Sequence, residues 1–475
     1  MNILLTRPLN QTPMLIPNIG LGYLATALRQ AGHKVTILDC IRDKIDVTQF
    51  FTVVKQSAYN LIGFQVYTFD VGVLPAYLQA AHEALPSAYL VTGGPHPTAQ
   101  SEEMLAQFSL LDALFCGEAE PGLPRLCSLL DGKPHQPLSK LYQQEFQEEL
   151  SLIPGLVFRT DENIVVRNQP QFVPDLDATG FPAWDLLGPE KYPPAPQGTF
   201  TRRLPVAPII VTRGCPYECT FCAAHLMAGR RLRSRSPQNV VDEIVFLCEN
   251  YGIREIHIED DNFSLNRKLV KNFCLELLNR NIDVTWSCPN GLRLDSLDKE
   301  LIQLMEKAGC YSIALGIESG SQRIIDLMKK KLNVVEVTEK IALIRQNSDI
   351  KITGFFIIGY PGETVSEIKQ TIRFSLQLDL DKVNFGAFMP LPGTSAFEEL
   401  KQQGVLENLD YSRITEYRTA FTFGELSTRK LRFLLQWSFF RFYIRPHVIF
   451  RFLKEIKSFH QVRVLGRRLL EVFWR

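Results

Sequence analysis

The chain has 475 residues, of which 45% are hydrophobic and 22% charged, a balance typical of globular proteins with two or three domains. The formal net charge is +1, but residues 429–475 hold twelve Lys or Arg against Glu455 and Glu471, so the rest of the chain carries about −9 by subtraction. No run of about 18 uncharged apolar residues occurs, and the first residues lack the pattern of a signal peptide. We therefore expect no membrane-spanning helix and a cytoplasmic location.

Seven of the ten cysteines are scattered without the spacing of a disulfide framework, and most lie in apolar stretches where a free thiol behaves as a small hydrophobic group. They are Cys40, Cys116, Cys127, Cys248, Cys274, Cys288 and Cys310. This pattern predicts a reducing compartment.

Residues 1–130 alternate short apolar, strand-like runs with helical segments, a pattern typical of an α/β fold with a doubly wound parallel sheet. The expected strands are residues 3–6, 34–38, 61–66, 88–92 and 113–116. In such sheets ligands bind at the carboxyl ends of the strands, and glycine there lets the backbone approach a ligand closely. The candidate ligand-binding residues of these loops are Thr68, Gly93, Gly94, His96, Gly117 and Glu118. His96 is flanked by two prolines, so contact with a ligand and a purely structural role are equally open.

Residues 131–200 contain several prolines and two strand-like runs, residues 155–158 and 163–167. The sequence Asp161-Glu-Asn163 between them has the composition of a turn. We expect a hairpin followed by a linker to the next domain.

From residue 201 to residue 400 the alternation of strand and helix patterns returns. The expected strands are residues 209–212, 255–258, 284–287, 311–316, 351–358 and 382–388. Six such units predict a partial (β/α)6 barrel, in which function is concentrated at the C-terminal ends of the strands. Polar residues and glycine follow these strands, and the candidates among them are Asp260, Asp261, Arg293, Glu318, Ser319 and Gly359.

Most of these candidates have a structural alternative. Asp260 and Asp261 could form an acidic first turn that complements a helix dipole. Glu318 and Ser319 could cap the following helix. Arg293 could form a surface ion pair. Their occurrence after successive strands favours a shared binding pocket.

The most specific motif is Cys215-Pro-Tyr-Glu-Cys219-Thr-Phe-Cys222, directly after the first strand of this second alternating segment. Soft thiolate ligands select iron–sulfur clusters or zinc. A closed zinc site would need a fourth ligand, and His225, three residues after Cys222, is a candidate. A 4Fe–4S cluster held by the three cysteines would instead leave one iron open to a substrate.

The cysteine loop, with Phe221 in the aromatic place before its last cysteine, resembles that of the radical S-adenosylmethionine (SAM) superfamily. The resemblance implies that Cys215, Cys219 and Cys222 hold a 4Fe–4S cluster whose open iron binds SAM. One electron from the cluster would then cleave SAM to methionine and a 5′-deoxyadenosyl radical. The resemblance extends to a partial barrel as the fold of this domain.

The same resemblance implies roles for the polar residues after the strands. One of the carboxylates after the second strand, Asp260 and Asp261 among them, would hold the amino group of the methionine part of SAM. Glu318 and Ser319 would contact the ribose or methionine part, and backbone near Gly359 would contact the adenine.

The N-terminal loops, with Pro17-Asn-Ile-Gly-Leu-Gly-Tyr-Leu-Ala25 and Ala31-Gly-His-Lys-Val35, resemble the cobalamin-binding domain that precedes many radical SAM modules. One variant of that domain ligates cobalt through an Asp-x-His-x-x-Gly motif, which the chain lacks. The resemblance therefore implies bound cobalamin without a histidine ligand below the cobalt.

Both resemblances together predict a cobalamin-dependent radical SAM enzyme that methylates an unactivated carbon. They imply that SAM methylates the reduced cobalamin, that a second SAM yields the radical, and that methylcobalamin delivers the methyl group. A cobalamin-dependent oxidation, rearrangement or cyclisation is the alternative within the class. An inactive cobalamin-binding sensor or scaffold is the alternative of another class, and the intact cysteines argue against it. The expected partners are a small-molecule or lipid substrate and an electron donor such as flavodoxin or ferredoxin.

Residues 401–475 are helical in pattern and interleave aromatic with basic side chains. One interpretation is a helical cap on the barrel with solvated arginines. The other is a surface-seeking amphipathic helix, because basic and aromatic residues together favour anionic lipid interfaces; the enzyme would then be peripheral at the inner membrane face. No RNA-binding module is evident, so no nucleic-acid partner is expected.

Overall fold

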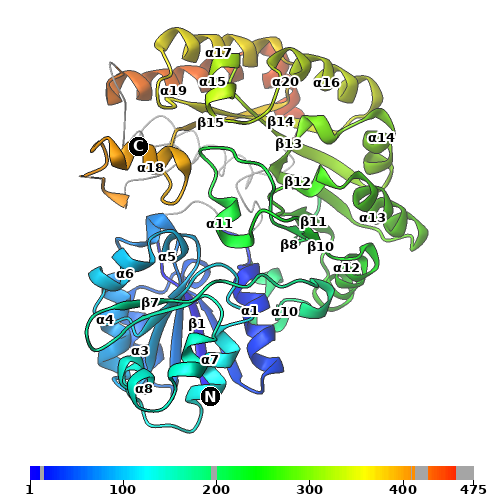
Figure 1. The fold of residues 1–475 in the computed structure, drawn as a ribbon. Helices are drawn as coiled ribbons and strands as arrows, with labels where there is room; N and C mark the ends of the chain where they lie inside the picture. Colours follow the sequence, from blue (N-terminus) through cyan, green and yellow to red (C-terminus); the bar gives the residue numbers. More distant parts are fainter. Residues whose placement is uncertain (11–14, 194–200, 408, 412–425, 456–475) are drawn as a thin grey trace. The chain divides into compact units, whose positions relative to one another are not determined.

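The computed structural model describes residues 1–10, 15–193, 201–407, 409–411 and 426–455, which divide into two compact units (Figure 1). The N-terminal unit consists of Met1–Gly188, Gly214–Pro216 and Ala223–Arg233. The C-terminal unit consists of Pro189–Arg213, Tyr217–Cys222 and Ser234–Arg475. The chain therefore passes between the two units several times around the cysteine loop.

The N-terminal unit is built on a seven-stranded sheet of order β2-β1-β3-β4-β5-β6-β7. The strands are β1 (Asn2–Arg7), β2 (Lys34–Asp39), β3 (Leu61–Gln65), β4 (Tyr89–Gly93), β5 (Ala113–Phe115), β6 (Leu156–Arg159) and β7 (Val165–Arg167). The first five pair in parallel, whereas β6 is antiparallel to both β5 and β7. The expected hairpin thus forms, and its two strands extend this sheet.

Most helices of this unit connect the strands of its sheet and run from blue to cyan in Figure 1, whereas the last two come after the sheet in sequence and run toward green. The helices are α1 (Ile19–Gln30), α2 (Cys40–Asp43), α3 (Val47–Lys55), α4 (Leu74–Ala84), α5 (Pro95–Ala99), α6 (Ser101–Gln107), α7 (Leu123–Leu130), α8 (Leu138–Gln144), α9 (Gln147–Ser151), α10 (Trp184–Leu187) and α11 (Ala224–Ala228). The chain runs from β1 outward to β2 and then crosses back to β3, so the strand order reverses between β1 and β3. Right-handed crossovers then put α1 on one face and α3 with α4 on the other, and α3 and α4 do pack together. This is a doubly wound sheet with its switch point at β1 and β3.

The C-terminal unit contains a six-stranded sheet of order β8-β11-β12-β13-β14-β15, with every neighbouring pair parallel. The strands are β8 (Val206–Ile209), β11 (Glu255–Ile258), β12 (Thr285–Leu292), β13 (Cys310–Glu318), β14 (Lys351–Ile358) and β15 (Lys382–Ala387). Two short strands lie outside this sheet, β9 (Thr212–Arg213) and β10 (Arg233–Ser234). Each strand of the sheet is added beside its predecessor, so all carboxyl ends lie at one edge.

Helices follow the strands of this sheet (Figure 1, green to orange). They are α12 (Pro237–Tyr251), α13 (Arg267–Asn279), α14 (Lys299–Lys307), α15 (Gln322–Leu327), α16 (Val334–Asn347), α17 (Val365–Gln377) and α18 (Ser395–Gln402). Phe263, Phe273 and Trp286 pack edge-to-face beneath α13, with ring centroids 5.5–6.1 Å apart. The predicted α/β class, with a doubly wound sheet and a partial (β/α)6 barrel, is confirmed.

Three strands of the barrel differ clearly in extent from the expectation. The third strand, expected to end at residue 287, continues through Leu292. The first strand of the barrel ends at Ile209, because the amides of Val211 and Thr212 donate to the carboxylate of Asp260 at 2.7 Å each instead of to a neighbouring strand. The fourth strand continues through Glu318, after a register shift between Gly316 and Glu318. The bulge and the left-handed backbone of Glu318 (φ 65°) turn the chain at the carboxyl end of β13.

The described C-terminal residues are helical, in α19 (Thr428–Tyr443) and α20 (Pro446–Glu455). Helix α19 packs on β15 and α17 through a buried face. The buried residues of that face are Leu431, Leu434, Leu435, Ser438, Phe439 and Phe442. Among the residues that the structure describes, no helix has the length and apolar character needed to span a membrane.

Candidate active site

The three cysteines of the loop after β8 differ in environment from most other cysteines of the chain. Cys215, Cys219 and Cys222 are half-buried, and all the others except Cys248 are buried. Burial raises the pKa of Cys40, Cys127 and Cys274 to about 12, which keeps those thiols protonated. The thiols of the loop are accessible soft donors, as a cluster requires.

In the part of the chain that the structure describes, no three His, Cys, Asp or Glu side chains are gathered in the geometry of a metal-ion site. What favours the three thiols as cluster ligands is therefore their spacing and their half-exposed state. Within the loop, the amide of Cys222 donates to the carbonyl of Cys219 at 3.1 Å, and the amide of Cys215 donates to the carbonyl of Gly229 at 3.1 Å.

Thr220 anchors the middle of the cysteine loop. It is buried, and its amide donates to the carbonyl of Met328 at the end of α15, at 3.0 Å. Its hydroxyl lies 2.7 Å from the phenol of Tyr360, in the turn after β14. Its carbonyl accepts from the amide of Ala396 in α18 at 3.0 Å. The position between Cys219 and Cys222 is thus held by three separate elements of the barrel.

Phe221, the residue before the last cysteine, packs against an apolar cluster on the same elements. The cluster consists of Ile324, Met328, Tyr360, Phe388, Ala396 and Leu400. An aromatic side chain here fixes the orientation of the loop through packing. This packing is sufficient to explain an aromatic residue at this position of the motif. A contact between Phe221 and a cofactor stays a prediction.

Arg293, at the carboxyl end of β12, contacts the loop from another side. Its guanidinium lies 3.7 Å from the ring centroid of Tyr217, the residue midway between Cys215 and Cys219. It also donates to the carbonyls of Lys330 and Lys331, at 2.9 and 3.0 Å. Arg293 also forms an ion pair with Asp295, but because Arg293 is only 9% exposed, its role is not limited to a surface ion pair. The guanidinium ties the segment after α15 to the cysteine loop.

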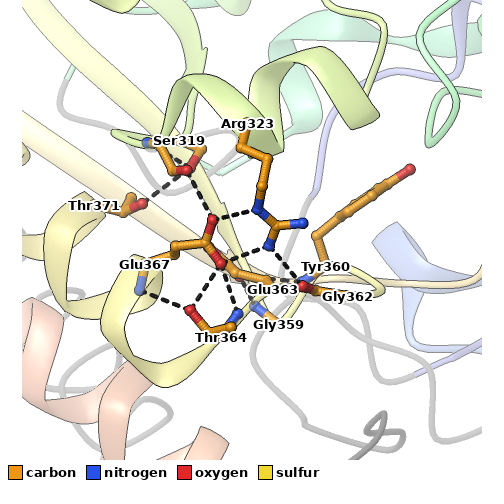
Figure 2. A network of polar contacts seen from close by, with 10 residues as sticks. Ser319, Arg323, Gly359, Tyr360, Gly362, Glu363, Thr364, Glu367 and Thr371 are labelled. Carbon is orange, nitrogen blue, oxygen red and sulfur yellow. Dashed lines mark hydrogen bonds and ion pairs between the residues drawn. The ribbon is translucent and has the colours of Figure 1, made fainter.

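Glu318, at the end of β13, pairs with Lys330. The carboxylate Oε1 lies 2.6 Å from the ammonium Nζ, and both side chains are largely buried. Burial alone lowers the pKa of Lys330, but the negative charges of Glu318 and Cys219 outweigh it and leave that pKa raised. Ser319, the next residue, turns the other way: its hydroxyl contacts that of Thr371 in α17 at 3.0 Å (Figure 2). The structure thus brings Glu318 toward the cysteine loop and buries Ser319 against α17.

The two aspartates after β11 also differ in their environment. Asp260 is buried, and its carboxylate accepts from the amides of Val211 and Thr212 and from the Thr212 hydroxyl, each at 2.7 Å. Burial raises the pKa of Asp260 to about 7, although these hydrogen bonds lower it. Its carboxylate therefore shapes the segment that leads into the cysteine loop. Asp261 is exposed.

The turn after β14 is held by Glu363 (Figure 2). Oε2 of Glu363 accepts from the amides of Gly359 and Tyr360 at 2.6 and 3.2 Å. Burial raises the pKa of Glu363 to about 8, and among the described residues its Oε1 has no hydrogen-bond partner. Gly359 has φ +75°, and a Cβ there would lie 2.7 Å from Leu431 of α19. Helix α19 therefore packs directly on this turn.

The helix that follows this turn is fastened to α15. Arg323 donates to both oxygens of Glu367 at 2.8 and 2.6 Å, and to the carbonyl of Gly362 at 2.7 Å (Figure 2). Thr364 and Glu367 form a capping box at the start of α17. These contacts make the turn after β14 a rigid part of the barrel edge.

In the N-terminal unit, Thr68 and His96 come together at the carboxyl edge of the sheet. Nδ1 of His96 lies 3.3 Å from the Thr68 hydroxyl, and burial lowers the pKa of this imidazole to about 4. Gly93 is the last residue of β4, and Gly94 has φ +110°, where a Cβ would lie 2.9 Å from the carbonyl of Val66. Thr68 thus follows β3, and the two glycines and the neutral imidazole lie at the end of the neighbouring strand β4.

Gly117 and Glu118, after β5, serve packing in this unit. The amide of Gly117 donates to the Thr98 hydroxyl at 3.0 Å. Glu118 forms a buried bidentate pair with Arg233, at 2.7 and 2.9 Å, and accepts from the amide of Val173 at 2.7 Å. Both oxygens of this carboxylate are thus engaged by protein donors.

Several groups at these edges carry no clear signal in the sequence. Arg7, the last residue of β1, is 7% exposed, and its Nε has no hydrogen-bond partner among the described residues. Asp70 lies near it after β3, and burial raises the pKa of Asp70. In the C-terminal unit, Lys330 is the middle residue of a run of three lysines. Such a run predicts exposed side chains, so the sequence does not indicate that Lys330 is buried. The one sequence signal for a functional role of Arg7 is its position at the carboxyl end of the first predicted strand.

Comparison with known families decides the identity of both units. Residues 209–375 match the Radical SAM superfamily, and residues 9–126 match the B12 binding domain. The chain is a radical SAM protein with a B12 binding domain. Its cofactors are those of the family, a 4Fe–4S cluster and SAM, together with cobalamin. The radical SAM match begins at the end of β8 and contains all three cysteines of the loop.

Relatives of known name extend the similarity over most of the chain. An uncharacterized methyltransferase of Pyrococcus horikoshii is 27% identical over 461 residues, which are 97% of this chain and 94% of that protein. Cytidylyl-2-hydroxyethylphosphonate methyltransferase of Streptomyces wedmorensis is 28% identical, covering 82% of this chain and 78% of that protein. An anaerobic magnesium-protoporphyrin IX monomethyl ester cyclase of Cereibacter sphaeroides is 29% identical, covering 84% of this chain and 62% of the cyclase.

Among solved structures, the radical SAM methyltransferase TsrM of Kitasatospora setae has the same fold. The TM-score is 0.66, at 20% identity, over 85% of this chain and 77% of that one. The family match and the relatives together make this radical SAM protein an enzyme, and the relatives include both methyltransferases and a cyclase.

Proposed function

We propose that this radical SAM enzyme methylates an unactivated carbon of a small-molecule or lipid substrate. The observation that carries the proposal is the set of three half-exposed thiols, Cys215, Cys219 and Cys222, on a loop anchored to the edge of the barrel. A B12 binding domain in the same chain supports methyl transfer, as do two methyltransferases among the relatives.

When bound, the cluster and SAM supply a carbon-centred radical, and cobalamin supplies a methyl carrier. The three thiols would hold the cluster, and Thr220 would keep their loop in place through Met328, Tyr360 and Ala396. Glu318 would contact SAM at the edge of β13. Of the two aspartates after β11, Asp261 is the better contact for the SAM amino group, because the Asp260 carboxylate already accepts three protein donors.

In the N-terminal unit, Thr68, Gly94 and His96 are the residues proposed to face cobalamin. Their loops follow β3 and β4, beside the reversal of strand order where doubly wound sheets bind ligands. Glu118 is better explained by its pair with Arg233, and Ser319 by its contact with Thr371. An external electron donor such as flavodoxin or ferredoxin would reduce the cluster.

A second candidate is a radical cyclisation or oxidation, which the similarity to the cyclase favours. The two functions differ in what becomes of SAM. Methyl transfer from SAM to cobalamin releases S-adenosylhomocysteine, and radical formation releases 5′-deoxyadenosine. A methyltransferase of this type yields both products, whereas a cyclase yields only 5′-deoxyadenosine.

The test is anaerobic incubation of the reconstituted enzyme with cobalamin, reductant and SAM that carries a trideuteromethyl group. Candidate lipids, tetrapyrroles and polyketides are added in turn, and the masses of the products are measured by mass spectrometry. Formation of S-adenosylhomocysteine together with a trideuteromethylated product supports the proposal. Product that forms without label and without S-adenosylhomocysteine would establish the cyclase-type function instead.

A membrane surface is the further partner that we propose, on the evidence of α19. The face of this helix opposite to the barrel exposes Phe433, Trp437, Phe440 and Ile444, at 60%, 39%, 45% and 52%. These positions recur at helical spacing, and neighbouring rings along the stripe stack at 5.8–6.2 Å. Exposed basic residues flank them, namely Arg429, Lys430, Arg432 and Arg441. Aromatic groups flanked by cations match an anionic lipid surface.

A further inference from the structure

The end of α15 and the segment that follows it lie against the cysteine loop. The carbonyls of Leu327 and Met328 accept hydrogen bonds from Thr220. The carbonyls of Lys330 and Lys331 accept from Arg293, whose guanidinium lies on the ring of Tyr217. The backbone on either side of Lys330 is left-handed, with φ 50° at Lys329 and 53° at Lys331. This double turn directs one lysine of three inward.

The ammonium of Lys330 is built into this position. Its side chain is 13% exposed, and its Nζ lies 2.6 Å from Oε1 of Glu318 and 5.8 Å from the ring centroid of Phe221. Gly316 makes room for the ion pair, because a Cβ there would lie 2.7 Å from the Glu318 oxygen and 2.8 Å from the Lys330 nitrogen. A side chain at residue 316 would therefore displace the pair.

Phe221 lies between Cys219 and Cys222, so the ammonium beside its ring is close to the sulfur ligands of the loop. Electrostatic interaction with Cys219 is one of the causes that raise the pKa of Lys330. A fixed positive charge near an iron–sulfur cluster favours the reduced, more negative form, and a fixed negative charge disfavours it. The low exposure of the pair limits screening by water and salt.

We propose that Lys330 and Glu318 together set the reduction potential of the cluster, with the ammonium raising it and the carboxylate limiting the rise. Lys330 acts through charge as a positioning residue, and it touches neither the substrate nor the reacting atoms in this role. The inference rests on the proposed function only in requiring that the cysteine loop holds a cluster. It adds a determinant of how readily the electron donor can reduce that cluster.

Three variants of the full chain, reconstituted without SAM, test this by redox titration followed by electron paramagnetic resonance. Lys330→Met removes the charge, and its midpoint potential should be more negative than that of the wild type. Glu318→Gln leaves the ammonium uncompensated, and its midpoint should shift in the opposite direction. Lys330→Arg keeps the charge and should stay close to the wild type. Lys329→Met is the matched control, because it removes the same charge from an exposed neighbouring position.

Opposite shifts in the first two variants, with an unchanged control, support the proposal, because a purely structural defect would not change sign. Equal or absent shifts in variants that retain wild-type iron and sulfide overturn it. If Lys330→Met fails to hold a cluster, the Glu318→Gln variant decides, since it leaves the lysine in place. A wild-type chain that binds no cluster would refute the proposed function itself, so the two failures are distinguishable.

Discussion

The hydroxyl of Thr220, in the cysteine loop, lies 2.7 Å from the phenol of Tyr360, in the turn after β14. Glu363 accepts a hydrogen bond from the backbone of the same turn, and Leu431 of α19 covers it. The loop that carries the thiols and the turn at the far side of the barrel edge are thus joined by one hydrogen bond between buried groups.

We expect Thr220→Val to weaken this connection more than Tyr360→Phe. The valine variant loses the contacts of the hydroxyl with both Tyr360 and the carbonyl of Leu327, and leaves the Tyr360 phenol buried without its nearest partner. This costs about 1–3 kcal/mol of the free energy of unfolding, and the phenylalanine variant costs about 0.5–1.5 kcal/mol. Thermal unfolding and iron content per chain measure the two effects. Equal iron content in all three proteins would contradict the anchoring role.

Replacement of Cys219 by Ala should abolish both the broad visible absorbance of the reconstituted cluster and the production of 5′-deoxyadenosine. The reason is that two thiolates cannot replace three as ligands of a 4Fe–4S cluster with one open iron. Cys248→Ala is the matched control, because Cys248 is also half-buried but lies on α12, away from the motif. Full SAM cleavage by the Cys219 variant would sink the assignment of the loop.

The cobalt of bound cobalamin should have no imidazole ligand from the protein on its lower face. The chain lacks the Asp-x-His-x-x-Gly motif, and His96 is buried against Thr68 as a neutral imidazole with a pKa of about 4. Electron paramagnetic resonance of bound cob(II)alamin should therefore lack nitrogen superhyperfine splitting from a histidine. Splitting that is present in the wild type and lost in His96→Ala would show that His96 is a ligand.

The stability of the C-terminal unit should fall as the pH rises toward 8. Burial raises the pKa of Glu363 to about 8 from its ordinary 4.5, so the folded chain holds this proton more tightly than the unfolded chain. The resulting stabilisation is complete below pH 4.5 and is lost as the pH approaches 8, by up to about 1.4 kcal/mol per pH unit. Glu363→Gln, which is neutral throughout, should lose less stability across this range in denaturant titrations. Glu336→Gln, at an exposed position of α16, is the control and should follow the wild type.

Sedimentation with vesicles should detect binding that requires anionic lipid and weakens with salt. Each aromatic residue of the α19 stripe that inserts adds about 1.5–3 kcal/mol at full burial, and each nearby cation adds about 1 kcal/mol before screening. Trp437→Ala should reduce the bound fraction, whereas Phe246→Ala, an exposed aromatic on α12, should not. Absence of wild-type binding to both anionic and neutral vesicles would leave α19 with a structural role alone.

The sequence alone was sufficient to predict the parallel strands of both sheets, but not that the hairpin strands β6 and β7 extend the first sheet. It also predicts the cysteine loop as a cluster site. Apolar runs of strand length alternate with helical periodicity, and this local pattern reflects burial on both faces of a parallel sheet. The spacing of Cys215, Cys219 and Cys222 is likewise local information, because cluster ligation depends on the chemistry and separation of the thiols. One face of α19 packs on the barrel, as the interpretation as a helical cap predicts, and the other face exposes aromatic rings. Contact with a membrane surface stays a prediction.

Only the tertiary structure decided which polar residues at the strand ends face the loop. Glu318 and Ser319 are adjacent and both polar, but the bulge in β13 and the left-handed backbone of Glu318 send them in opposite directions. Asp260 accepts hydrogen bonds from backbone amides that a longer first strand would have used. Lys330 points inward because Arg293, 37 residues away in sequence, holds its backbone. Such orientations depend on long-range hydrogen bonds and backbone strain, which cannot be predicted from residue type and spacing.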